Sequence, residues 1–142
     1  MIRSILAGIV GIAVAFGIVF ANETLGHMMS PPQEGIDFTD PEVVRPYLAS
    51  LPAWKLLQVM AGWVVGVFVG ILVASRIGRA RVVAYTSIIG GLMLAATISN
   101  LIIIPHPLWF NVTSLGALGL SAWFAKSIAE KRAVSVTDSL RD

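Results

Sequence analysis

Residues 5–21 have the sequence ILAGIVGIAVAFGIVFA, and no charged or hydrogen-bonding side chain interrupts them. As a helix, such a run approaches the roughly 20 residues that cross the hydrocarbon core of a bilayer. A secretory signal peptide is the alternative, because Val19-Phe20-Ala21 has the small-residue spacing of a cleavage site. The apolar region of a signal peptide usually has about 7–15 residues, however, so we interpret the run as a retained membrane helix.

Three more apolar stretches follow, and together they predict the fold class. We expect transmembrane helices at about residues 4–27, 53–75, 82–104 and 108–125, with an outer loop at 30–52 and a polar tail at 126–142. The composition agrees: 56% of the 142 residues are hydrophobic and 13% are charged, and the mean hydropathy is +0.83. So few polar groups cannot cover a water-soluble surface. The predicted fold is an all-α, four-helix transmembrane bundle.

The distribution of basic residues predicts the orientation. Cytoplasmic loops of membrane proteins are enriched in Lys and Arg. If the N-terminus is cytoplasmic, only Arg45 and Lys55 lie outside. The other basic residues then lie inside: Arg3, Arg76, Arg79, Arg81, Lys126, Lys131, Arg132 and Arg141. Both termini are therefore predicted to be cytoplasmic. Because the basic residues flank apolar runs, the formal charge of +2 does not indicate a nucleic-acid partner.

A short amphipathic helix is predicted within the outer loop. Asp40-Pro41-Glu42 has the form of an N-cap, a proline at the first helical position and an acidic first turn. The apolar residues that follow fall on one face: Val43, Val44, Tyr47, Leu48 and Leu51. We expect this helix to lie on the membrane surface.

Small residues recur at every fourth position in the predicted membrane helices. Such stripes allow close approach of helix backbones in lipid, where the hydrophobic effect does not drive association. We assign helix packing to Gly62, Gly66, Gly70, Gly91, Ala95, Ala117 and Ser121. The alternative is compositional, because Gly is generally frequent in membrane helices.

Polar side chains in and beside the spans gather at the outer ends. They comprise Asn22, Glu23, His27, Lys55, Gln58, Asn100, His106 and Asn111, of which all but Lys55 are candidates for a polar site. A channel or transporter needs polar groups along a whole path, whereas this chain supplies them at one end. The sequence therefore predicts an outward-facing polar site, with Glu23 and His27 on one helical face because they are four residues apart.

Four interpretations of this polar cluster remain open. Glu23, His27 and His106 could bind a divalent metal; His27 and His106 could hold a haem; Glu23 and His27 could act as an acid–base pair. The fourth is that these groups cap helix ends and contact water and lipid head groups. We predict no cofactor, and the absence of cysteine excludes disulfides and thiolate metal sites.

Three segments resemble a group of small bacterial four-helix membrane proteins to which no activity is attached. They are GHMMSPP at residues 26–32, DPE at 40–42 and NLIIIPHPLWF at 100–110. The resemblance implies a four-helix fold and a location in the bacterial inner membrane. Apart from the resemblance, the partners that we expect are the lipid bilayer and either further copies of the chain or a larger membrane complex. We expect a non-enzymatic component that self-associates or joins such a complex. The alternative is an enzyme or ligand-binding protein with a periplasm-facing polar site.

Overall fold

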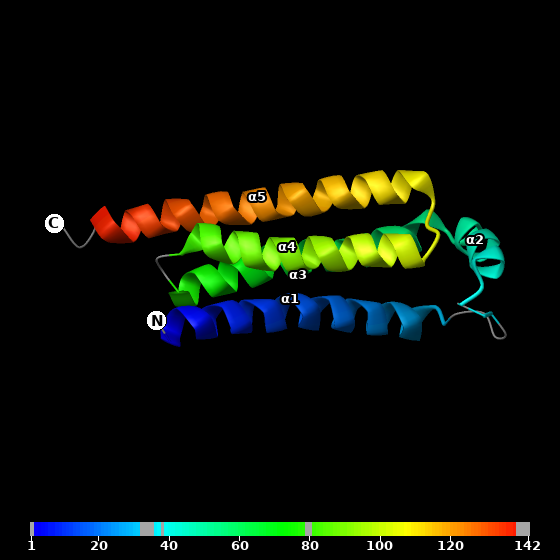
Figure 1. The fold of residues 1–142 in the computed structure, drawn as a ribbon, viewed down its shortest axis with the longest axis horizontal. Coiled ribbons are helices and arrows are strands. Elements are labelled where there is room, and N and C mark those ends of the chain that lie inside the picture. The colour runs from blue at the N-terminus through cyan, green and yellow to red at the C-terminus, as the bar shows by residue number, and fades with distance from the viewer. Residues whose placement is uncertain (1, 32–35, 38, 79–80, 139–142) are drawn as a thin grey trace.

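The computed structural model describes residues 2–31, 36–37, 39–78 and 81–138, which form five helices and no strand. Four long helices lie side by side as a bundle, and the short α2 lies beyond one end of it (Figure 1). α1 begins, and α5 ends, at the opposite end. The elements in chain order are α1 (Ile2–Met29), α2 (Pro41–Ser50), α3 (Ala53–Gly78), α4 (Val82–Ile103) and α5 (Leu108–Asp138).

The four long helices are long and apolar enough to cross a membrane. Their outer surface is apolar as well: Ile9, Phe16 and Phe20 of α1 are all exposed. A water-soluble protein rarely exposes so large an apolar surface, whereas lipid covers it at no cost. These helices confirm the prediction of an all-helical protein with four candidate membrane spans.

The closest helix contact is between α1 and α3. Gly66 is packed so tightly that an added Cβ would lie 2.7 Å from the carbonyl oxygen of Ala15. An added Cβ at Gly70 would lie 2.7 Å from the carbonyl oxygen of Gly11. The two backbones therefore touch, and only glycine fits at these positions of α3.

α3 is also the helix around which the other three long helices are arranged, since it packs against each of them. Trp63 of α3 meets Phe110 of α5 edge to face, with ring centroids 5.7 Å apart. Further along, the Ser121 hydroxyl donates to the carbonyl oxygen of Val64 at 2.7 Å. Ser121 thus joins α5 to α3 by a hydrogen bond between helices as well as by its small size.

α4 packs into the bundle with large side chains. Its buried residues are Val82, Tyr85, Ile89, Met93 and Thr97. Its small-residue stripe lies on another face, where Ser87, Gly91, Ala95 and Ser99 are all exposed. Nothing lies within 4 Å of a Cβ added at Gly91. Within one chain, therefore, Gly91 and Ala95 make no helix contact of the kind assigned to them from sequence.

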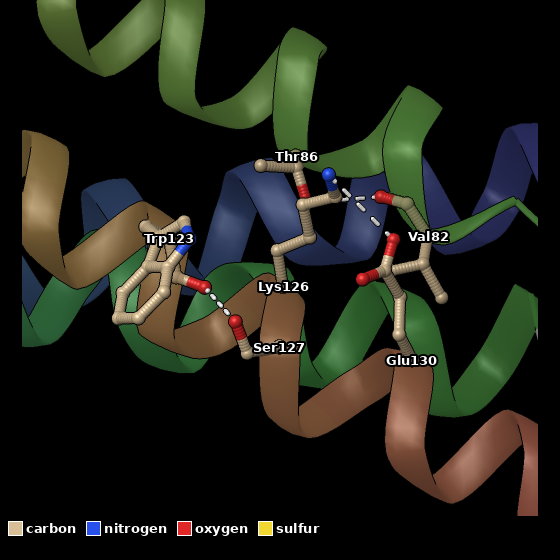
Figure 2. A network of polar contacts seen from close by, with 6 residues as sticks. All are labelled: Val82, Thr86, Trp123, Lys126, Ser127 and Glu130. Carbon is tan, nitrogen blue, oxygen red and sulfur yellow. Dashed lines mark hydrogen bonds and ion pairs between the residues drawn. The ribbon is translucent and has the colours of Figure 1, made fainter.

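α5 continues past Ala125, where the sequence predicts that the last span ends and a polar tail begins. The helix extends to Asp138. Its next turns remain anchored because Ala129 is still buried. Figure 2 shows an ion pair between Lys126 and Glu130, one turn apart at 3.7 Å, beside the first turn of α4. Such pairs support a helix on its exposed side.

Candidate functional site

A cavity of about 260 Å³ lies at the α2 end of the bundle. Side chains from α1, α2, α3 and α4 and from the α4–α5 connection line it. The polar part of the lining includes Glu23, His27, Lys55, Gln58, Asn100 and His106, and the apolar part is Val44, Leu48, Leu51, Leu56, Val59 and Ile104. The cavity therefore combines charged and apolar walls, as ligand pockets do.

α1 and α4 both line the cavity at the α2 end of the bundle, and they contact each other at the other end. There, the Tyr85 hydroxyl donates to the carbonyl oxygen of Ser4 at 3.3 Å. Near that end, a Cβ added at Gly11 would lie 2.7 Å from Ile89. At the α2 end, Asn100 of α4 and His27 of α1 both line the cavity. The two helices thus contribute side chains to one cavity at this end.

α2 supplies the apolar cover of the cavity. The Asp40 carboxylate accepts a hydrogen bond from the Glu42 N–H at 2.9 Å and caps the helix as predicted. On the predicted apolar face, Val44 and Leu48 are only 2% and 7% exposed, whereas Val43 is exposed. Part of the face expected to meet the membrane surface is therefore buried within the protein.

Asn22 and Gln58 fix α1 against α3 beside the cavity. The Asn22 amide donates to the Gln58 carbonyl oxygen at 2.9 Å, and the Gln58 amide donates to the Asn22 carbonyl oxygen at 2.6 Å. Each bond depends on a glycine on the facing helix. An added Cβ at Gly62 would collide with the Asn22 side chain, and an added Cβ at Gly26 would collide with the Gln58 side chain. Both amides have a structural role, because each donates a hydrogen bond to the backbone of the other helix.

Two opposite charges line the cavity without pairing. The Lys55 ammonium donates to the Ser30 carbonyl oxygen at 3.0 Å, which leaves two of its three N–H donors for other partners. Among the described residues, the half-buried Glu23 carboxylate accepts no hydrogen bond and makes no ion pair. Lys55 and Glu23 are therefore available to a ligand.

Both histidines line the cavity, and a contact with a backbone carbonyl oxygen determines the roles of their ring nitrogens. His27 Nδ1 lies 2.7 Å from the Glu23 carbonyl oxygen, and His106 Nδ1 lies 2.9 Å from that of Ile104. A carbonyl oxygen only accepts, so each Nδ1 carries the proton and a neutral ring has its acceptor at Nε2. Burial lowers the pKa of His106, although the hydrogen bond to Ile104 opposes this effect. His106 also stacks on Phe110, with centroids 4.7 Å apart.

The predicted Glu23–His27 pair meets only through the backbone of Glu23, because His27 bonds the carbonyl oxygen and not the carboxylate. Glu23, His27 and His106 line one cavity. Among the described residues, however, no group of three or more His, Asp or Glu side chains is arranged to hold a metal ion.

The two remaining predicted site residues are asparagines with buried, unpaired oxygens. Asn100 lines the cavity, and its Oδ1 has no donor among the described residues. Asn111 has the same unpaired Oδ1. It lies in the first turn of α5 and does not line the cavity. The structure thus brings Glu23, His27, Gln58, Asn100 and His106 to one cavity, places Asn22 beside it, and leaves Asn111 outside it.

Sequence reasoning placed Lys55 at the outer ends of the spans without assigning it to the site, and it left out the α2 residues. Lys55 resembles a membrane-boundary residue by position alone, and only the Ser30 contact shows that it faces the loop side of the cavity. The signal for α2 was its short connection to α3 through Leu51 and Pro52, which holds it close to the bundle end.

Comparison of the chain with protein-family models, with curated proteins and with solved structures finds no match. The geometry of the cavity therefore carries the argument for function.

Proposed function

We propose that this chain is a small multi-pass membrane protein that binds a small ligand in the cavity under α2, without converting it chemically. The observation that carries the proposal is that Glu23 and Lys55 line one cavity and do not pair with each other. Unpaired charges beside apolar walls are costly unless a partner or water completes them. A bound ligand supplies that partner.

The proposed orientation places the cavity on the periplasmic side of a bacterial inner membrane. In support, the fold brings the start of α1, the end of α3 and the end of α5 to the end of the bundle opposite α2 (Figure 1). Arg3, Arg76, Lys131 and Arg132 belong to these segments. Such an excess of basic residues is typical of the cytoplasmic side.

Single cysteines test this orientation, because the chain has none of its own. Ala49→Cys in α2 and Lys131→Cys in α5 both replace exposed residues. In intact cells, an impermeant maleimide should label the first and label the second only after lysis. The reverse pattern would place the cavity on the cytoplasmic side.

Native mass spectrometry of the full-length protein, released from its membrane in mild detergent, tests ligand binding. We expect a bound mass on the wild type that Val59→Trp removes, because Val59 lines the cavity and the larger ring fills it. The matched control is Val65→Trp, which enlarges an exposed position of the same helix. A wild type without adduct, or equal adducts on both variants, would contradict the proposal.

A second candidate function is self-association through α4, or docking of α4 in a larger membrane complex. It is favoured by one observation, the exposed stripe of Ser87, Gly91, Ala95 and Ser99. In lipid, such faces pair closely. Gly91→Leu should therefore shift an oligomer toward monomer in single-molecule photobleaching, whereas Gly116→Leu on the exposed side of α5 should not. A monomeric wild type would rule out self-association and leave docking in a larger complex as the only form of this candidate.

A further inference from the structure

We infer that the ligand of the cavity is the head group of a membrane phospholipid that carries a phosphate and a primary ammonium, with its acyl chains remaining in the bilayer. This inference rests on the proposed function and names its ligand class. It is built on the charge, the hydrogen-bonding capacity and the position of the cavity lining.

The charges of the cavity lining favour a ligand that carries both a positive and a negative charge. Lys55 retains two N–H donors for an anion, and the Glu23 carboxylate has no partner among the described residues. A purely anionic head group would pair with Lys55 and leave Glu23 as a like charge nearby. A zwitterion gives both side chains an oppositely charged partner, because its phosphate can pair with Lys55 and its ammonium with Glu23.

The hydrogen-bonding capacity favours a primary ammonium over a quaternary one. Besides the Glu23 carboxylate, the lining offers the Nε2 acceptors of His27 and His106, since both Nδ1 atoms donate to carbonyl oxygens. A primary ammonium has three N–H donors for such acceptors. A trimethylated ammonium has none, so a choline head group would leave these acceptors unsatisfied.

The size and position of the cavity favour the head group of a lipid. At about 260 Å³, the cavity is smaller than the roughly 300–1,000 Å³ pockets that enclose drug-sized ligands. It lies at the α2 end of the candidate spans, which corresponds to head-group depth if these helices cross the bilayer, and both α1 and α4 line it. Beside it, Leu25, Met29, Ile102 and Ile103 are exposed on these two helices. These side chains provide an apolar surface for acyl chains.

The test is a lipid titration of the purified full-length protein by native mass spectrometry. The probes are phosphatidylethanolamine, phosphatidylcholine and phosphatidylglycerol with identical acyl chains. We expect phosphatidylethanolamine to bind about tenfold more tightly than either of the others, because it alone satisfies both charges through hydrogen bonds. Equal binding of the three lipids would overturn the inference, and this comparison needs no variant.

Two variants locate the preference within the cavity. Glu23→Gln should reduce the discrimination between ethanolamine and choline lipids, because it removes the charge and leaves only neutral acceptors, and Lys55→Gln should weaken binding of all three lipids. The matched controls are Glu130→Gln and Lys131→Gln, at the other end of the bundle, which should change neither result. An unchanged preference in Glu23→Gln would overturn the assignment of the ammonium to that residue.

A soluble compound separates the two possible sources of this chemistry. Glycerophosphoethanolamine carries the same head group without acyl chains, and we expect it to compete only at much higher concentration. If it binds as tightly as the lipid, the ligand is a soluble zwitterion and the lipid assignment is wrong. If the wild type carries a non-lipid mass that Val59→Trp removes, the proposed function stands and this inference fails.

Discussion

The side-chain amides of Asn22 and Gln58 donate reciprocally to each other's backbone carbonyl oxygen across 36 residues of sequence. Each bond holds α1 and α3 at the depth and rotation that the other bond requires. Together with Gly26 and Gly62, these two hydrogen bonds fix one side of the cavity. The proposed ligand site therefore has a rigid wall between α1 and α3, next to the cover formed by α2.

Removing either amide should loosen the α1–α3 contact. We expect Asn22→Ala and Gln58→Ala each to lower the unfolding free energy by about 1 kcal/mol, which is typical of hydrogen bonds between membrane helices. The double variant should cost less than the sum, because the first loss already relaxes the register of the second bond. Unfolding by SDS measures these values. Thr24→Ala is the control, since its hydroxyl bonds within α1, and full additivity would show that the bonds act independently.

Gly66→Ala should destabilise the protein by about 1–3 kcal/mol, because the added methyl meets the Ala15 backbone and cannot be accommodated by a side-chain rotation. Gly119→Ala is the matched control on α5, where nothing lies within 4 Å of the new Cβ. Thermal unfolding in detergent should separate the two variants, with the control equal to the wild type or more stable. Equal effects would mean that the α3 glycines reflect composition alone.

The cover formed by α2 should depend on one of two adjacent valines. Val44→Asp places a carboxylate at a position only 2% exposed, whereas Val43→Asp changes an exposed neighbour. We expect faster hydrogen exchange of the α2 amides in the first variant alone, with α1 and α3 unaffected. Identical exchange in both variants would show that α2 is held by its connections rather than by its buried side chains.

The stability of the protein should fall as the pH drops below about 6.5, the ordinary pKa of histidine. Burial lowers the pKa of His106 in the folded chain, so the unfolded chain binds more protons in this range. The loss should level off once the pH passes below the pKa of the folded state. Thermal unfolding of the wild type and of His106→Asn, compared between pH 8 and pH 5, isolates this contribution. A wild type that gains stability in acid relative to the variant would show that the cavity favours the imidazolium.

The spans were predictable from sequence because lipid demands long apolar helices, and Asp40-Pro41 marked the start of α2 for local reasons. The face that each helix turns inward was harder to predict. Every long helix offers a small-residue stripe, yet α4 buries Tyr85, Ile89 and Met93 instead. That choice depends on how the four helices fit together, and no local pattern encodes it.

The sequence predicted that polar residues cluster at one end of the bundle, but it did not predict that they line a cavity. Glu23, His27, Asn100 and His106 could be placed at one depth by counting along the spans. The cavity between side chains of α1, α2, α3 and α4 and the burial of Val44 and Leu48 are properties of the assembled bundle. The length of α5 escaped prediction because Ala129 gains its burial only from neighbouring helices.

The intimate contact of α1 with α3 has a consequence for biogenesis. The first helix of the chain finds its main partner only after the outer loop and the whole of α3 have been synthesised. Until then the Asn22 side chain lacks the Gln58 carbonyl oxygen to which it donates in the folded chain. The reciprocal bonds of Asn22 and Gln58 and the contacts of Gly66 and Gly70 with α1 therefore require α3 to be complete.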